Sequence, residues 1–155
     1  MVMTSPRRKS SLGVVSHARL AAIWETGIVE KHIDNMERVE AMVARLPQAI
    51  RVDIEAWGGE PTFRVNGKNF IFCNHDASGL SVKLDNEEAA AVIATDPLAE
   101  PSGYGLGRHG WVSVQVGPRP DTDRWRQIEE WVRTSYTKVA PTRLAKQVLA
   151  EDALD

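Results

Sequence analysis

PTFRVNGKNFIFCNHDASGLSVKL, residues 61–84, is the stretch that decides how this chain folds. Two strand-like runs meet at Asn66-Gly67, a pair that supplies the two positive-φ positions of a tight type I′ hairpin turn. A cluster of turn residues at 74–79 then leads into a third run. The stretch therefore predicts three neighbouring antiparallel strands.

The turn also predicts the register of the hairpin and the two faces of the sheet. With Asn66 and Gly67 in the loop, Arg64 faces Asn69 and Phe63 faces Phe70. Because side chains alternate along a strand, one face should be a core and the other should be mixed. The expected core face is Phe63, Val65, Phe70, Phe72, Leu80, Val82 and Leu84, and the expected outer face is Thr62, Arg64, Asn69, Ile71, Cys73, Ser81 and Lys83.

Helix signals flank this stretch on both sides. Asp34 with Glu37, and Asp85 with Glu88, are capping boxes that predict two helix starts. A longer helix is predicted after residue 121, with an apolar stripe at helical spacing, and a short terminal helix follows it. The stripe consists of Trp125, Ile128, Val132, Tyr136 and Val139.

Two further alternating segments, residues 49–57 and 111–116, predict additional strands. In the first, Ile50, Val52 and Ile54 should face the core, while Arg51, Asp53 and Glu55 should face outward. The order of elements predicts an α+β domain at residues 34–150: an antiparallel sheet of about five strands with helices packed on one face.

The N-terminal residues differ in composition from the rest of the chain. Residues 1–15 are rich in Ser, Pro and basic side chains and lack periodicity, which predicts disorder. Residues 16–33 show a weak amphipathic pattern. We therefore expect residues 1–33 to be a basic disordered tail with at most one extra helix, and Met36 is an alternative start.

Composition and charge narrow the functional class. The chain has 43% hydrophobic residues, 26% charged residues and one cysteine, and it has no apolar run long enough for a membrane span, so we expect a cytoplasmic protein. Residues 1–20 hold four basic side chains and no acidic one, which leaves 15 basic against 21 acidic side chains in the remainder. An acidic domain is a poor candidate for strong binding to nucleic acid without sequence preference.

A series of short motifs runs in a fixed order along residues 34–146. These are Leu46-Pro47, Trp57-Gly58, Pro61-x-Phe63, Val65-x-Gly67-Lys68-x-Phe70, Leu80-x-x-Lys83, Gly110-Trp111-Val112-x-Val114 and Ser135-Tyr136. In this order and spacing they resemble the MmcQ/YjbR family. The resemblance implies a small bacterial α+β protein whose sheet is similar to the double-wing DNA-binding domain of a phage transcription factor. It implies double-stranded DNA as a partner by fold analogy, and it carries no catalytic residues.

The outer sheet face is the main candidate site. Arg64, Asn69, Lys83 and Trp111 should lie there, with Arg108 in the Gly-rich loop before Trp111. Cations and an aromatic ring on one face suit phosphate contacts and base stacking. The alternative is a solvated face with charge pairs between strands, and Asp53 and Glu55 on the same face favour it.

Other chemistry has weaker signals. The loop contains a literal G-x-G-x-x-G at Gly105, Gly107 and Gly110, but a strand follows it where a dinucleotide site needs a helix. Cys73, His75, Asp76 and His109 lack the spacing of a zinc site, so we expect no metal and no cofactor. No nucleophile motif or paired carboxylates are visible, so we do not expect an enzyme. Two hypotheses remain: a non-enzymatic DNA-binding module, and a module that binds a protein or a small ligand.

Overall fold

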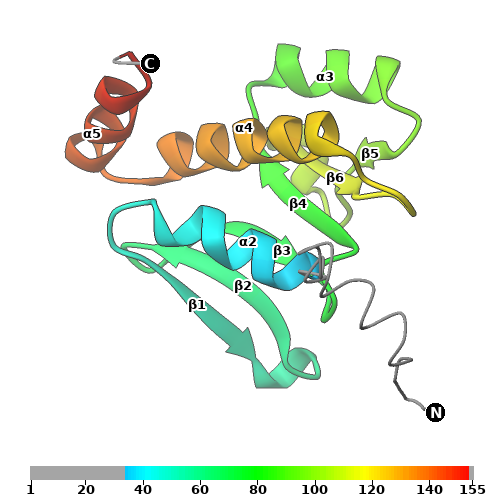
Figure 1. Ribbon diagram of the computed structural model, residues 1–155, viewed down its shortest axis with the longest axis horizontal. Coiled ribbons are helices and arrows are strands. Elements are labelled where there is room, and N and C mark those ends of the chain that lie inside the picture. The colour runs from blue at the N-terminus through cyan, green and yellow to red at the C-terminus, as the bar shows by residue number, and fades with distance from the viewer. Residues whose placement is uncertain (1–33, 154–155) are drawn as a thin grey trace, which may run out of the picture. The chain divides into compact units, whose positions relative to one another are not determined.

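A six-stranded antiparallel sheet runs through the part of the chain that the computed structural model describes, residues 34–153 (Figure 1). The strands are β1 (Ala49–Ile54), β2 (Glu60–Val65), β3 (Lys68–Cys73), β4 (Gly79–Lys83), β5 (Ala99–Pro101) and β6 (Trp111–Gln115), in the order β1-β2-β3-β4-β6-β5. The helices are α2 (Asn35–Ala44), α3 (Asn86–Thr95), α4 (Thr122–Val139) and α5 (Thr142–Ala153). The predicted α+β class is confirmed. The expected tail and extra helix at residues 1–33 lie outside the described residues.

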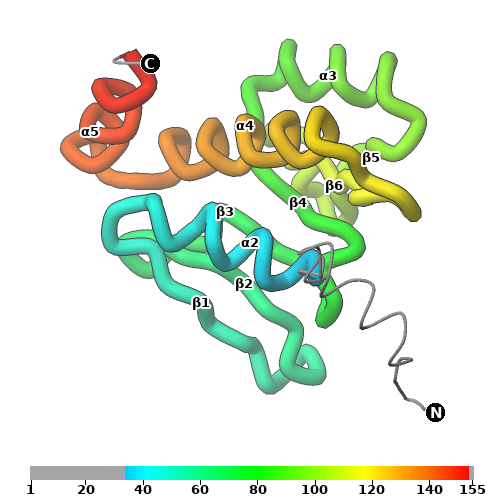
Figure 2. Tube along the Cα trace, in the orientation of Figure 1, coloured from blue at the N-terminus to red at the C-terminus, as the bar shows by residue number. Residues whose placement is uncertain are grey.

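The chain path explains the order of the strands (Figure 2). The strands from β1 to β4 pair with their neighbours in sequence, and β4 then pairs with β6 rather than with β5. Helix α3 and β5 lie between β4 and β6 in the chain, and β5 returns to pair with β6 at the sheet edge. Residues 96–110, where the sequence predicts only a loop, thus contain β5, so the sheet has six strands rather than the expected five.

One of the two predicted capping boxes forms. Asp34 accepts a hydrogen bond from the backbone N–H of Glu37 at 2.8 Å, and the Glu37 carboxylate accepts one from the N–H of Asp34 at 3.1 Å. The box predicted at Asp85 and Glu88 is wrong, because the Asp85 side chain makes no capping bond. Its carboxylate instead forms an ion pair with Lys138 of α4.

The predicted hairpin turn is confirmed, but the register beyond it changes. Asn66 and Gly67 have φ of 53° and 78°, and Arg64 pairs with Asn69 as predicted. A β-bulge then places Phe63 opposite Ile71 rather than Phe70. Because the bulge inserts one extra residue into β3, the face of each following side chain is reversed.

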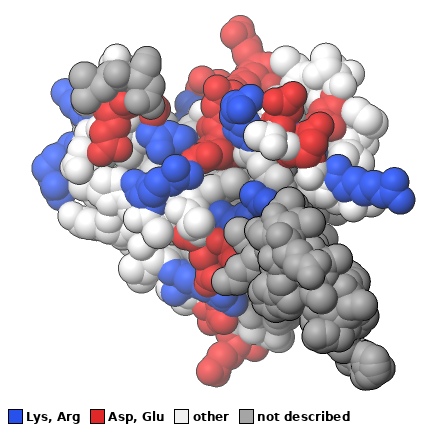
Figure 3. All heavy atoms as spheres, viewed as in Figure 1, with Lys and Arg blue, Asp and Glu red and all other residues white. Residues whose placement is uncertain are grey.

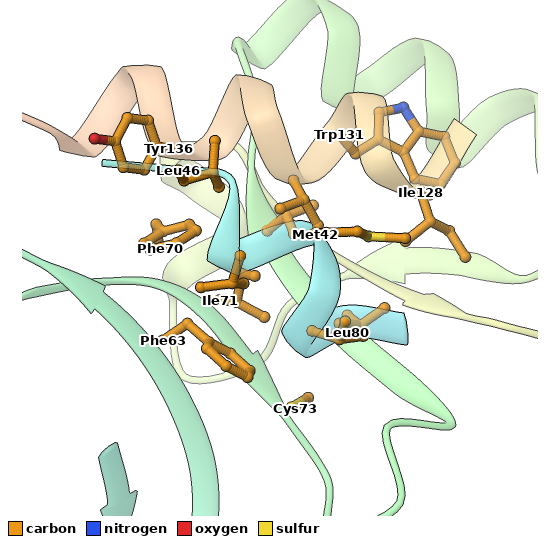
Figure 4. Packing of buried hydrophobic residues seen from close by; sticks show 14 of the residues in the cluster. Met42, Leu46, Phe63, Phe70, Ile71, Cys73, Leu80, Ile128, Trp131 and Tyr136 are labelled. Atoms are coloured by element: carbon orange, nitrogen blue, oxygen red, sulfur yellow. The ribbon is translucent and has the colours of Figure 1, made fainter. Parts of the chain in front are cut away.

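Because of the bulge, the faces predicted for three residues of β3 are wrong. Ile71 and Cys73, expected on the outer face, are buried in the core, whereas Phe72 lies on the outer face opposite Thr62. Phe70 remains in the core, where its ring meets that of Tyr136 edge-on at 5.4 Å. Figure 4 shows Phe63, Phe70 and Ile71 packed together with side chains from α2 and α4.

Ser135 of α4 completes the hydrogen bonding at the bulge. Its hydroxyl donates to the carbonyl oxygen of Phe70 at 2.6 Å and accepts from the backbone N–H of Lys83 at 2.8 Å. The side chain is fully buried. The hydroxyl therefore bridges β3 and β4 next to the pair Ile71–Val82. It supplies each of two backbone groups with the hydrogen-bond partner that buried backbone groups require.

The two faces of β1 are the reverse of those predicted. Arg51 pairs with Phe63, so it lies on the helix side, where its guanidinium contacts Glu40 of α2 and Asp53, each at 2.8 Å. Ile50 and Val52 pair with Arg64 and Thr62 and therefore belong to the outer face. Residues 55–57 form a 3₁₀ turn rather than strand. The alternation of β1 predicts a strand correctly but not which face is inward. At this sheet edge Arg51 and Asp53 lie on the helix side, because Glu40 of α2 offers Arg51 an ion-pair partner there.

Candidate functional site

The pairing of the strands brings four of the five predicted site residues onto one outer face. Arg64 lies directly opposite Asn69 on β2 and β3, and Lys83 lies directly opposite Trp111 on β4 and β6. Arg64, Asn69 and Lys83 are half-buried, and Trp111 is 8% exposed. The helices that form the core with this sheet pack on its other face.

Three aromatic rings form a row across this face. The Trp57 and Phe72 rings lie 6.3 Å apart with 33° between their planes, and Phe72 meets Trp111 edge-on at 5.2 Å. Trp57 is 55% exposed, so its ring is available to a ligand, whereas Trp111 is largely buried and packs edge-on against Phe72. We call Trp57, Phe72 and Trp111 the aromatic row. Sequence reasoning missed Phe72, because the bulge that turns its side chain outward leaves no clear mark in the sequence.

The two cations of this face form no ion pair within the described part of the chain. Among residues 34–153 there are seven ion pairs, and none involves Arg64 or Lys83. On the helix side, Arg45 pairs with Glu129 and Arg133 pairs with Asp152. Figure 3, which has the orientation of Figure 1, shows basic and acidic side chains interspersed over the visible surface. Within this part of the chain no carboxylate therefore neutralises Arg64 or Lys83, a property that they share with Arg38 of α2 and with Arg143 and Lys146 of α5.

The acidic residues expected beside these cations are placed elsewhere. Asp53 lies on the helix side with Arg51, and Glu55 leaves the sheet in the 3₁₀ turn. The carboxylates that the register does place on the outer face are Glu60, opposite Ile54, and Glu100, opposite Ser113. The expectation that Asp53 and Glu55 oppose an anionic ligand on this face is therefore wrong.

The pair Arg64–Asn69 contains two buried polar atoms without a hydrogen bond in the described part of the chain. These atoms are Arg64 Nε and Asn69 Oδ1. Buried polar atoms are nearly always bonded in folded proteins. Nε of Arg124 is also buried without a hydrogen bond within residues 34–153, although its guanidinium forms an ion pair with Asp96, so an unbonded Nε does not by itself mark a binding site.

A shallow polar depression of about 250 Å³ adjoins the aromatic row. Phe72 forms part of its lining, and Glu60 and Gln115 lie at positions separated by the two central strands. The hydroxyls of Ser81 and Ser113 are 2.7 Å apart within it. The depression thus offers a carboxylate, an amide and hydroxyls next to an aromatic ring.

The Gly-rich loop serves the backbone rather than a nucleotide. It forms a 3₁₀ turn, Leu106–His109, that leads into β6, so no helix N-terminus follows the G-x-G-x-x-G pattern. A Cβ on Gly110 would lie 2.0 Å from the carbonyl oxygen of Leu84. Arg108 folds back against Gly105 of its own loop. Arg108 therefore differs from the other four predicted site residues, because it lies in a 3₁₀ turn and its guanidinium approaches its own loop.

The groups considered for metal or thiol chemistry are dispersed. Cys73 lies in the core, where burial raises the pKa of its thiol to about 12. Within residues 34–153, no three His, Cys, Asp or Glu side chains come together closely enough to hold a metal ion. In the same part of the chain, no helix has the length and apolar character that crossing a bilayer requires.

The family model described as YjbR matches residues 44–138. The chain belongs to the YjbR family. Among solved structures, Deinococcus radiodurans protein DR2400, described by the domain DUF419, is similar with a TM-score of 0.57 and 19% identity, over 75% of this chain and 88% of that one. That likeness supports the α+β fold, and no curated protein matches the chain.

Proposed function

We propose that this YjbR-family protein binds DNA through the outer face of its sheet. The observation that carries the proposal is the placement of Arg64 and Lys83, neither of which has an ion-pair partner among residues 34–153, beside the aromatic row. Guanidinium and ammonium groups contact phosphate oxygens, and exposed aromatic rings stack on bases. The face combines both.

The expected affinity is modest. After residue 20 the chain holds 15 basic against 21 acidic side chains, which disfavours a polyanion at long range. Two or three phosphate contacts, from Arg64, Lys83 and the loop residue Arg108, would give a slope of log K against log salt of roughly −2 to −3. The dissociation constant should lie at about 1–100 μM at physiological salt.

We assign no catalytic step to this face and propose a binding role in the cytoplasm. Its hydroxyls, on Ser81, Ser102 and Ser113, bond to one another rather than to a histidine or a carboxylate. A serine nucleophile needs an adjacent base. This arrangement supports recognition of a ligand rather than its chemical conversion.

Fluorescence anisotropy of labelled DNA with the full chain, at two salt concentrations, tests the proposal. Arg64→Gln with Lys83→Gln should weaken binding at least tenfold and flatten the salt dependence by roughly two units of slope. The matched control is Lys146→Gln, which removes a cation of α5 that forms no ion pair within residues 34–153. If the double variant binds as tightly as the control, the outer face is not the site. If the unmodified chain does not bind at low salt, the proposed function is wrong.

A second candidate is a protein interface, and the edge strand β1 favours it. Ile50 is 58% exposed and Trp57 is 55% exposed, and within residues 34–153 β1 is paired only on its β2 side. Exposed apolar residues beside an unpaired edge are typical of a docking surface. Capture of partners from lysate, with and without nuclease, separates the two candidates. A partner that persists after nuclease and is lost with Ile50→Lys would favour the protein interface.

A further inference from the structure

We infer that the outer face takes single-stranded DNA, with its phosphates on one side of Phe72 and a base edge in the depression on the other side. The inference rests on the proposed function and narrows its substrate class. The supporting observation is a separation of charge across the sheet that the strand register defines.

The outer face consists of three parallel rows of side chains. On one side of Phe72 lies a cationic row with Arg64, Asn69, Lys83 and Trp111. The middle row runs through Thr62, Phe72, Ser81 and Ser113 and ends at Glu100 of β5. On the other side lies a row with the Glu60 carboxylate and the Gln115 amide, with Gly79 between them. Phosphate affinity and base-edge chemistry are therefore on opposite sides of the aromatic ring.

This order suits a chain with one phosphate rail. A single strand can lay its phosphates on Arg64 and Lys83 while its bases turn toward Phe72 and Glu60. Rows four residues apart on a strand are separated by about 13 Å. A duplex presents a second phosphate rail across a major groove about 12 Å wide, and that rail would meet the Glu60 carboxylate. Charge complementarity thus favours the single strand.

The exposed aromatic surface has the same preference. The Trp57 ring is 55% exposed and lies against Phe72, so it offers a flat apolar surface next to the depression. Bases of a duplex are stacked on both sides, whereas unpaired bases can stack on such a ring. The groups of the depression likewise need a base whose pairing edge is free.

The carboxylate of Glu60 adds a prediction about which base is preferred. Carboxylates accept hydrogen bonds from the exocyclic amine of cytosine, which thymine replaces with a carbonyl oxygen. Cytosine and thymine are both pyrimidines, so a difference between them reports the edge more than the stacking surface. We expect oligo-dC to bind more tightly than oligo-dT, by several-fold.

The test compares labelled oligo-dC, oligo-dT and a duplex of equal length, each with the full chain at low salt. Oligo-dC should bind at least tenfold more tightly than the duplex. Trp57→Ala should weaken oligo-dC binding by about fivefold or more, while Trp57→Phe should retain most of it. Glu60→Gln should remove the preference for dC over dT. Thermal unfolding of each variant checks that it folds.

The outcomes separate the inference from the proposed function. Duplex binding that equals or exceeds oligo-dC binding, or an unchanged affinity of folded Trp57→Ala for oligo-dC, overturns the single-strand inference and leaves DNA binding intact. If none of the three probes binds, the single-strand inference and the proposed function are both overturned.

Discussion

Replacing Ser135 by alanine tests the hydrogen bonding that holds the bulge of β3. The substitution removes one oxygen atom from a fully buried position on α4. It leaves the Phe70 carbonyl and the Lys83 N–H, now bonded at 2.6 and 2.8 Å, without a partner. An unsatisfied buried polar group costs about 1–3 kcal/mol, so we expect a loss of about 2–4 kcal/mol in the free energy of unfolding.

Urea unfolding followed by circular dichroism measures this loss. A slope of about 1–3 kcal/mol per molar urea converts it into a midpoint lowered by roughly 1–2 M. Thr137→Ala is the matched control, because the Thr137 hydroxyl donates only to the carbonyl of Thr134 within the same helix, at 2.8 Å. We expect the control to change stability by less than about 0.5 kcal/mol. A Ser135→Ala variant as stable as this control would refute the bridging role.

Two further predictions concern the loop before β6 and the end of α3. Gly110→Ala should unfold the domain or lower its free energy of unfolding by about 3 kcal/mol or more. The reason is that φ of Gly110 is +87° and the new Cβ would lie 2.0 Å from the Leu84 carbonyl oxygen. A thermal midpoint within a few degrees of that of the parent would contradict this prediction. Although burial opposes its ionisation, hydrogen bonds from Arg124 and from the backbone of Leu98 hold the pKa of Asp96 below its ordinary value. This stabilisation is therefore fully present above the pKa of the unfolded state, about 3.9, and is lost as pH falls through the lower pKa of the folded state. The difference in unfolding free energy between the parent and Asp96→Asn should consequently narrow as pH falls toward about 3. A difference that does not change with pH would contradict this prediction.

The hairpin and its neighbours show how far sequence patterns reach. Asn66-Gly67 predicts the turn because few other residue pairs accept positive φ at both positions, and the structure has φ of 53° and 78° there. Near the turn the predicted register is correct, and Arg64 lies opposite Asn69. Beyond it, Phe70, Ile71 and Phe72 are all apolar, and no polar residue among them marks where the alternation slips.

Most of the candidate site was predictable from the sequence, but the position of Phe72 was not. Lys83 and Trp111 follow from alternation on strands that continue without a bulge. Phe72 depends on a bulge that Ser135 satisfies from 65 residues away along the chain, which no local pattern can reveal. The faces of β1 depend on the same kind of distant contact, because Glu40 of α2 accepts a hydrogen bond from Arg51.

The insertion of α3 and β5 between β4 and β6 has a consequence for the order of folding. The β2–β3 hairpin closes a two-residue loop, whereas pairing of Lys83 with Trp111 must first close the segment 84–110. Hairpins form within about 1–10 μs, and longer loops add an entropic cost that delays distant pairing. We therefore expect the half of the outer face with Arg64 and Asn69 to be assembled before the half with Lys83 and Trp111, which pulse-labelled hydrogen exchange would show as earlier protection of β3 than of β6.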